Sequence, residues 1–277
     1  MSARHKGLVL VAVLWLVAAL GVIATGMMQS VKNEATVTGR IRDSVTASAW
    51  GEAAMQIALQ AIATSGKTPE AAMQESVTYA GLTIPVRAAP LNGYIDINKA
   101  PVELLGQMLQ TAAGLSQPQA RQLAQAIVDV RSKPGPSGKV GLFEAPEDLM
   151  QVAGFDYPLY AAVASLITTD SRGSGRVNPL AAPPQVLRVL SAGNDAAVAH
   201  FAAGRAAGQP GLDQSFMNGA WLDAAGSNVV ELEALVPMSD GSTIRVQRRF
   251  ILGKSNDGLP WRVFGAETTS AAVSQDQ

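Results

Sequence analysis

A stretch without charged side chains, Leu8–Met28, restricts this chain more than any other part of its sequence. A helix of this length extends about 32 Å at about 1.5 Å per residue, which matches the hydrocarbon core of a bilayer, about 30 Å thick. Backbone polar groups in lipid must bond to one another, so a single segment that crosses a membrane has to be helical. Arg4 and Lys6 precede the stretch and favour a cytoplasmic N-terminus, with everything after Met28 on the opposite side.

The surrounding residues leave three interpretations of this start open. A cleaved signal peptide needs an apolar core of about 7–15 residues and a small-x-small cleavage site, whereas this core is longer and Ala24–Gly26 is a weak site. An uncleaved signal anchor fits the length. In the third interpretation, Gly7 joins the basic segment directly to the apolar stretch, which resembles the leader of type IV pilin-like proteins. A peptidase cuts those leaders after the glycine and leaves the apolar helix in place.

Composition argues against several classes of function. The chain has 277 residues, a formal net charge of −1 and no cysteine. A near-neutral charge disfavours a nucleic-acid-binding protein, and the lack of cysteine excludes disulfides, thiolate metal sites and a cysteine nucleophile. His5 lies in the leader and His200 stands alone, so a histidine-based triad or zinc site has too few members. Ser, Asp and Glu form no recognisable catalytic motif, and we expect the protein not to be an enzyme.

Helical spacing of apolar residues continues after Met28 as far as Ala63, and Gly66 and Pro69 then end the pattern. This predicts one long helix over residues 8–65, the first half apolar and the second half amphipathic. A helix that continues so far beyond a membrane suits packing onto a domain and onto neighbouring subunits.

Short strands are predicted on both sides of a helical block. Pro85 suggests that its strand lies at a sheet edge. Asp170–Arg176, rich in Gly and Ser, is the clearest linker in the chain. The order of elements predicts an α+β fold in which a helical domain interrupts a domain with an antiparallel sheet. The expected strands lie at 77–87, 94–97, 229–236, 243–252 and 261–264.

The chain also contains an internal echo. Tyr94–Leu105 and Arg176–Leu187 both pass from a short β-like run to an Asn, then to Ala-Pro, then to an apolar helix. Together with the leader Arg4–Gly7 and the closing hairpin Asn228–Leu252, this order resembles the minor pseudopilin K family of type II secretion systems, also called general secretion pathway protein K. The resemblance covers nearly the whole chain.

One position near the N-terminus fits the resemblance closely. Most pilin-like proteins carry a glutamate where this chain has Ala12, and members of the K family resemble this chain in lacking the acid. An acidic side chain in lipid is costly unless it is paired. A subunit without it cannot pair with the terminal amine of the subunit ahead, which suits one that starts a filament.

The resemblance implies a structural role. Prepilin peptidase would cut between Gly7 and Leu8, and Leu8 would become the N-methylated terminus. The protein would be anchored in the bacterial inner membrane by a single pass, with its main domain in the periplasm. It would lie at the tip of the pseudopilus, with the minor pseudopilins I and J and the major pseudopilin as partners. The resemblance implies no binding of nucleic acid. The implied parts are a leader (1–7), a transmembrane and amphipathic helix (8–65), a discontinuous pilin-like α/β domain with an antiparallel sheet (66–97 and 176–265), an inserted all-helical, SAM-like domain (98–175) and a disordered tail (266–277).

Members of the K family are associated with calcium, which takes about six to eight oxygen ligands. The loop Arg131–Gly141 contains no acid, and helix capping or solvent exposure explains Glu144, Glu147 and Asp148 more simply. We therefore assign no calcium ligand, and calcium remains an expectation from the resemblance alone.

The helical block also resembles tandem helix-hairpin-helix domains of the competence type, and a membrane-tethered nucleic-acid-binding protein is the alternative hypothesis. Those domains hold phosphates with backbone N–H groups of a Gly-x-Gly-like hairpin. The hairpin positions Ala113–Ser116 and Ala153–Asp156 lack the second glycine, and Asp156 would repel phosphate. We expect a shared scaffold without DNA binding. We likewise expect Arg245, Arg248 and Arg249 to line a solvated strand face rather than to bind an acidic partner.

Overall fold

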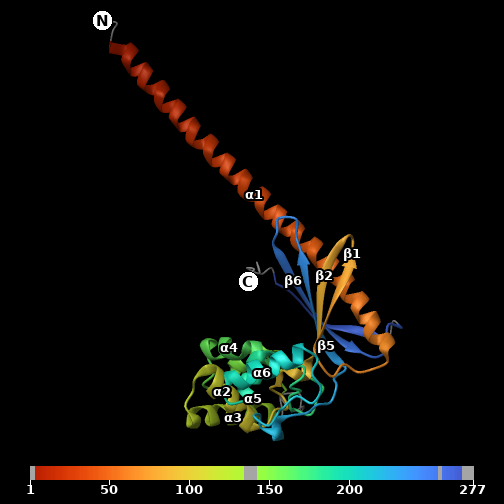
Figure 1. Ribbon diagram of the computed structural model, residues 1–277. Coiled ribbons are helices and arrows are strands. Elements are labelled where there is room, and N and C mark those ends of the chain that lie inside the picture. Colours follow the sequence, from red (N-terminus) through yellow and green to blue (C-terminus); the bar gives the residue numbers. More distant parts are fainter. Residues whose placement is uncertain (1–3, 134–141, 255–257, 270–277) are drawn as a thin grey trace.

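The computed structural model describes residues 4–133, 142–254 and 258–269. It is an α+β structure with a five-stranded antiparallel sheet and helices, which confirms the predicted fold class at that level. Figure 1 shows a long helix, a sheet packed along its second half, and a group of helices at one end of the sheet. We call this group, residues 91–228, the helical body.

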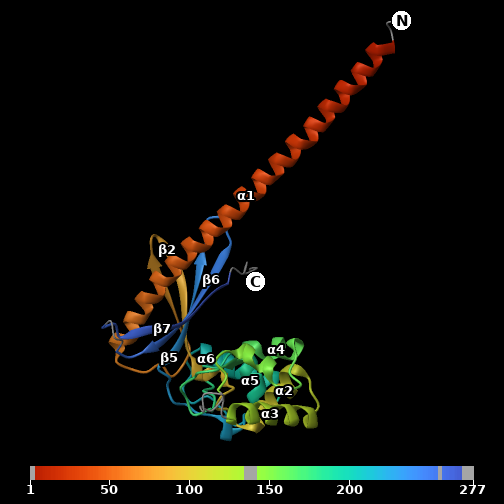
Figure 2. The same cartoon turned by 180° about the vertical axis from the view of Figure 1, so that it is seen from behind.

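The first helix, α1 (Arg4–Ser65), runs without a break for 62 residues, as the spacing of its apolar residues predicts. Its first half projects from the molecule and its second half lies along the sheet (Figures 1 and 2). A Cβ atom at Gly51 would come within 2.9 Å of Val246 on the sheet, so this glycine allows α1 to approach closely. The α1 side chains buried on the sheet recur every three or four residues and are Ala47, Ala54, Met55, Ala58, Leu59 and Ile62.

The predicted membrane segment falls in the projecting half of α1. Within the residues that the structure describes, no helix is both long enough and apolar enough to span a membrane. Most side chains of Leu8–Met28 lie outside the described part, so the predicted membrane segment stays a prediction.

The five strands follow the order β1-β2-β5-β6-β7 across the sheet. Their bounds are β1 Met73–Tyr79, β2 Leu82–Pro90, β5 Val229–Pro237, β6 Thr243–Leu252 and β7 Trp261–Thr269. Alternate residues of the central strands, such as Ile84, Leu232 and Val246, are buried against α1. The period-2 pattern in the sequence therefore reflects a sheet with one face covered by α1 and one open, more polar face.

Two details of the sheet differ from expectation. Pro85 does not lie on an edge strand, because β2 pairs with β1 on one side and with β5 on the other. The pairing with β5 covers Val86–Pro90, so Pro85 lies beyond it and its missing N–H breaks no bond there. At the C-terminus, β7 continues to Thr269, so residues 266–269 belong to the sheet and not to a tail. Residues 270–277 lie outside the described part.

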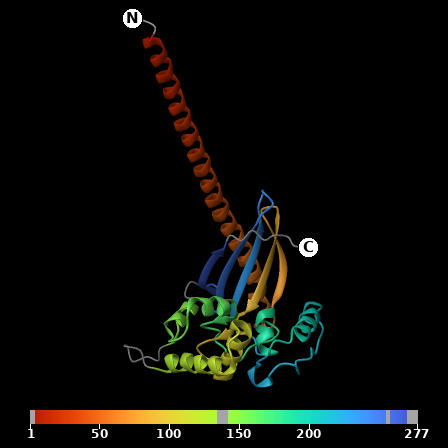
Figure 3. The ribbon, with the colours of Figure 1, turned by 90° about the vertical axis from the view of Figure 1, so that its left-hand side faces the viewer.

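The helical body is inserted between two neighbouring strands. β2 ends at Pro90, whose partner is Val230 at the start of β5, so both connections to the body leave the sheet at the same end. This end lies far from the N-terminus of α1 (Figure 3). The elements of the body are η1 Leu91–Gly93, β3 Ile95–Asp96, α2 Val102–Ala113, α3 Gln117–Ser132, η2 Pro146–Gln151, α4 Tyr157–Val163, η3 Ala164–Leu166, β4 Ile167–Thr168, α5 Pro184–Leu190, α6 Asp195–Ala206 and η4 Gly219–Trp221.

One hydrophobic core holds the helical body together. It joins Leu104 of α2 and Ile127 of α3 with Val186 of α5 and Phe201 of α6. This packing extends across the domain boundary predicted at 175/176, because α5 and α6 lie with the other helices and not with the sheet. The sheet and α1 have a separate core. A third, small cluster at the junction consists of Leu91, Val229 and Ile251.

The two segments of the echo adopt matching structures. Pro101 and Pro183, both in extended conformation, directly precede α2 and α5. Arg131 of α3 donates hydrogen bonds to two backbone carbonyl groups in the loop before α2. Arg205 of α6 donates hydrogen bonds to three backbone carbonyl groups in the loop before α5. The echo is thus a repeated loop–helix–helix unit, in which a guanidinium from the second helix holds the loop that precedes the first.

Candidate functional site

The predicted cleavage site lies at the opposite end of α1 from the helical body (Figure 1). Gly7 and Leu8 are helical residues of α1, which begins at Arg4. The side chains of Leu8 and Ala12 lie outside the described part. Cleavage after Gly7 and methylation of Leu8 therefore stay predictions.

Farther along α1, an apolar stripe lies uncovered. Val37, Ile41 and Val45 are 55%, 60% and 65% exposed, and each lies four residues from the next, hence on one face of the helix. We call these three residues the α1 stripe. It ends where Ala47 begins the contact with the sheet. A row of exposed apolar side chains on a projecting helix is typical of a surface that packs against another helix.

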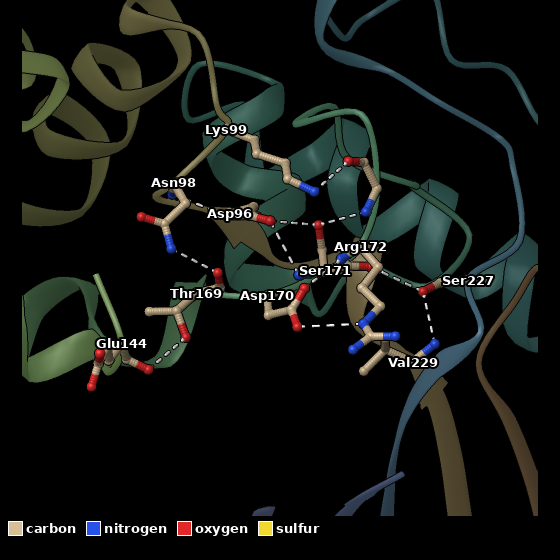
Figure 4. Close-up of polar contacts among 11 residues, drawn as sticks. Asp96, Asn98, Lys99, Glu144, Thr169, Asp170, Ser171, Arg172, Ser227 and Val229 are labelled. Atoms are coloured by element: carbon tan, nitrogen blue, oxygen red, sulfur yellow. Dashed lines mark hydrogen bonds and ion pairs between the residues drawn. The ribbon is translucent and has the colours of Figure 1, made fainter. Parts of the chain in front are cut away.

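The end of the helical body that lies next to the sheet is built around Asp96, which is 2% exposed. One of its carboxylate oxygens accepts a hydrogen bond from the backbone N–H of Asn98 at 2.9 Å. The other accepts two from Ser171, from the N–H at 3.1 Å and from the hydroxyl at 2.7 Å (Figure 4). Because β3 and β4 pair in parallel beside it, this carboxylate joins the turn that leaves β3 to the chain that leaves β4.

The segment Asp170–Arg176, predicted to be a linker, is part of this network. Ser171 and Gly175 are buried, and a backbone carbonyl of the segment accepts a hydrogen bond from the Lys99 ammonium at 3.1 Å. The Ser171 carbonyl accepts another from the hydroxyl of Ser227, just before β5, at 3.1 Å (Figure 4). The linker prediction was wrong because Gly and Ser here permit close packing: a Cβ atom at Gly175 would collide with the Lys99 backbone.

Of two buried asparagines in the helical body, Asn178 bonds to the chain after α1 and Asn92 bonds within the body. Asn178 donates its side-chain amide to the backbone carbonyl of Glu70, and its N–H donates to the carbonyl of Asn92 at 2.8 Å. Asn92 donates its own amide to the carbonyl of Ala225 at 2.7 Å. Its Oδ1 is buried and has no partner among the described residues. Hydrogen bonds from three separate segments therefore meet at this junction.

A further polar group lies on the open face of the sheet, at its border with the body. The Tyr94 hydroxyl donates to one oxygen of Glu231 at 3.1 Å, and Arg249 donates to the other at 3.0 Å. Burial, and then the charge of Glu231, raises the pKa of Tyr94 far above its ordinary value of 10.0. The phenol therefore remains a hydrogen-bond donor at neutral pH.

The arginines of β6 are paired within the chain. Arg245 and Arg249 each form an ion pair with a glutamate of β5, at 3.4 Å and 3.0 Å. Arg248 faces α1, where its nearly buried side chain pairs with Glu52 at 2.6 Å. The expected solvated face is wrong for Arg248, because the alternation of the strand directs it to the covered side of the sheet and Glu52 offsets the burial of its charge.

The acidic residues that follow the loop Arg131–Gly141 are engaged elsewhere. The Asp148 carboxylate accepts hydrogen bonds from the N–H groups of Glu144 and Ala145 at 2.8 Å and 3.0 Å. Glu147 accepts one from the Tyr160 hydroxyl at 2.8 Å. Within residues 4–133, 142–254 and 258–269, no three His, Asp or Glu side chains come together as metal ligands would. These acids do not fit the oxygen-rich cage that calcium requires. Residues 134–141 lie outside the described part.

The two hairpins that resemble DNA-binding motifs have capping roles. Gly114 ends α2 with a left-handed φ of 68°, and the Gln119 side chain accepts a hydrogen bond from the Ser116 N–H at the start of α3. Asp156 caps α4 by accepting a hydrogen bond from the N–H of Leu159 at 3.0 Å. Its carboxylate occupies the helix N-terminus at which a phosphate would bind.

Sequence patterns did not single out the residues that hold these loops. Arg131 and Arg205 are partly buried, and burial lowers the pKa of both guanidinium groups. The sequence did contain a signal for them, because the two arginines occupy equivalent places. Arg131 lies in α3, directly after α2, and Arg205 lies in α6, directly after α5. The partners of Asp96 and Asn92 lie far away in the sequence, so no local pattern indicates them.

Comparison with known proteins gives no match, either among protein-family models or among curated proteins. The functional argument rests on three features of the chain itself. These are the projecting helix with the α1 stripe, the sheet on its second half, and the hydrogen-bonded junction that carries the helical body.

Proposed function

We propose that this chain is a minor pseudopilin of the K type, a structural subunit at the tip of a type II secretion pseudopilus. The observation that carries the proposal is the insertion of the helical body between β2 and β5, at the end of the sheet remote from the start of α1. A long helix serves assembly with other subunits. A wide body at the far end leaves no room for another copy to follow, so the subunit ends the filament.

The features of α1 support this role. Leu8–Met28 would hold the subunit in the bacterial inner membrane before assembly, with the helical body in the periplasm. The α1 stripe would then pack against the helices of the minor pseudopilins I and J and of the major pseudopilin. Ala12 provides no acid to pair with the amine of a subunit ahead, as suits the first subunit of a filament.

The pilin-like arrangement would also require the sheet and the helical body to act as one unit. Asn178 and the N–H of Ser227 donate hydrogen bonds to the carbonyls of Glu70 and Pro69 in the loop after α1, so the body is bonded to more than its two covalent connections. Buried hydrogen bonds of this kind are costly to break, because each leaves a polar group without a partner. A rigid tip is what a subunit needs if secreted proteins are to be pushed by the filament beneath it.

The alternative, a membrane-tethered nucleic-acid-binding protein, has weaker support. The chain has a net charge of −1, the arginines of β6 pair with glutamates, and Asp156 occupies a helix N-terminus. Electrophoretic mobility shift at moderate salt separates the two hypotheses. Tight binding of duplex DNA by the chain would favour the alternative.

Co-purification tests the proposal most directly. The tagged full chain, solubilised in mild detergent, is expected to retain the minor pseudopilins I and J. Ile41→Asp places a charge in the α1 stripe without touching the buried core and should weaken retention, whereas the matched change Ile41→Val should not. A wild-type chain that retains neither partner contradicts the proposal.

Mass spectrometry of the chain isolated from cells tests the processing. The mature protein is expected to begin at methylated Leu8, and Gly7→Val should leave the leader in place. A start near residue 27, or an intact Met1 in the wild type, would count against pilin-like processing.

A further inference from the structure

Among the described strands, β1 forms one edge of the sheet, so half of its backbone groups point away from the sheet. The turn from β1 to β2 has two residues in the left-handed region, with φ of 51° and 78°, so the residues flanking it form a hydrogen-bonded pair. Such pairs alternate along an antiparallel ladder, which directs the N–H and C=O groups of Gln74, Ser76 and Thr78 away from β2. Within the described residues, these groups have no backbone partner.

This edge lacks the features that usually protect one. Natural edge strands carry Pro, Lys or a bulge that prevents another strand from adding. β1 keeps a continuous register with β2 from Met73 to Tyr79, contains neither Pro nor Lys, and has Glu75 as its single charged residue. The opposite edge differs, because the pairing of β6 with β7 is irregular between Arg249 and Phe250.

Beside this edge, α1 leaves an apolar layer uncovered. Ile57 of α1 and Met73 and Tyr79 of β1 are 47%, 43% and 40% exposed. Ala61 and Ser65 follow Ile57 at intervals of four residues, so all three lie on one flank of α1. Between this flank and the start of β1 opens a groove of about 800 Å³, whose lining includes Ala61, Ile62, Pro69 and Met73. α1 therefore extends beyond β1, over a position where a sixth strand would lie next to β1. The described residues of the chain place no strand there.

We infer that the β1 edge accepts an extended segment of a partner pseudopilin as a sixth strand, with apolar side chains of that segment in the groove beneath α1. The inference rests on the proposed function and names the surface by which the partner binds. Main-chain hydrogen bonds to Gln74, Ser76 and Thr78 supply affinity, and the groove supplies specificity. Glu70 and Glu75 also line the groove against one cation, Lys67, so the bound segment carries a basic residue there.

A second copy of this chain fits the edge less well than a different partner. The end of α1 and the start of β1 line the same groove, so β1 runs back along α1 (Figure 1). Pairing of β1 with β1 of another copy around a two-fold axis would be antiparallel and would point the two α1 helices in opposite directions. Two copies anchored in one membrane have their α1 helices pointing the same way.

The test compares Ser76→Pro with Ser76→Ala in the full chain. Proline removes the outward N–H and adds a ring to the free edge, while the N–H of Ser76 makes no bond to β2, so the sheet is retained. Alanine keeps the N–H. We expect Ser76→Pro to lower retention of the minor pseudopilins I and J by about tenfold or more, from the loss of a main-chain hydrogen bond and a steric clash, and Ser76→Ala to leave it unchanged.

The outcomes separate this inference from the proposed function. If the wild type retains I or J and Ser76→Pro retains it equally, the strand-acceptor site is wrong and the proposed function stands. If the wild type retains neither, both fall. A homodimer that Ser76→Pro disrupts would overturn the assignment of the partner. Should Ser76→Pro lower the melting temperature markedly, Ile57→Glu tests the same site on an exposed helix position, with Ile57→Leu as its matched control.

Discussion

Replacing Asp96 by alanine should strongly loosen the end of the helical body that lies next to the sheet. The carboxylate accepts three hydrogen bonds, at 2.9 Å, 3.1 Å and 2.7 Å, and is 2% exposed. The Ser171 hydroxyl can rotate to another acceptor after the change, but the N–H groups of Asn98 and Ser171 cannot.

The size of the effect follows from these two N–H groups. Each buried donor left without a partner costs about 1–3 kcal/mol, and the carboxylate leaves a small cavity, so we expect a loss of about 3–5 kcal/mol in the local stability of this end of the body. Asp156→Ala is the matched control, because Asp156 is exposed and accepts one capping hydrogen bond. Loss of a helix cap costs about 1 kcal/mol.

Hydrogen exchange of the native full chain, read by mass spectrometry, measures this loss locally. Peptides that cover 95–100 and 167–173 should lose protection by about 100-fold to 4,000-fold in Asp96→Ala, since each 1.4 kcal/mol corresponds to about a factor of ten. Peptides from β5 and β6 should change much less. If Asp96→Ala alters protection no more than Asp156→Ala does, the network is not what holds these two loops together.

Two further predictions concern the sheet. Gly51→Ala places a Cβ atom 2.9 Å from Val246 and should destabilise the protein by about 1–3 kcal/mol in thermal unfolding. Its control, Gly39→Ala, meets no atom within 4 Å and should stabilise the helix by about 0.5–1 kcal/mol. Equal effects of the two changes would refute the close contact between α1 and the sheet. Tyr94→Phe should be less stable than the wild type at neutral pH. Since the folded state raises the pKa of Tyr94, that advantage is present below pH 10.0 and is lost as the pH rises above it, so the two stabilities should converge in alkaline urea titrations. A constant difference up to high pH would contradict the role of the Tyr94 proton.

Local patterns predicted the regular elements well. The spacing of apolar residues after Met28 gave the continuation and the end of α1, because a helix that packs on a sheet must repeat its apolar residues every three or four positions. Alternation in Thr243–Leu252 gave β6 with its observed bounds. Such predictions succeed because each depends on residues within one element.

Predictions failed where distant segments decide the structure. Asp170–Arg176 has the composition of a flexible linker, yet Asp96 and Lys99 fix it in place. Gly and Ser occur both in free linkers and where backbones pack closely, and composition does not distinguish the two. The same limit applies to α5 and α6, whose apolar faces are evident from the sequence but whose position beside α2 depends on contacts across the chain.

The groove beside β1 and the junction share one segment of chain, the loop that follows α1. Pro69 and Glu70 line the groove, and their backbone carbonyls accept hydrogen bonds from Ser227 and from Asn178 of the helical body. A strand bound in the groove would therefore contact the same residues that fasten the body to the sheet. Binding that orders this loop would favour the bonded junction, and a bonded junction would favour binding, because coupling between two sites is reciprocal. The hydrogen bonds of Asp96 lie within the helical body, so Asp96→Ala should weaken retention of a partner pseudopilin only slightly. Asn178→Ala removes the bond to Glu70 and should weaken retention more. An equal effect of the two changes would argue against a role of the loop.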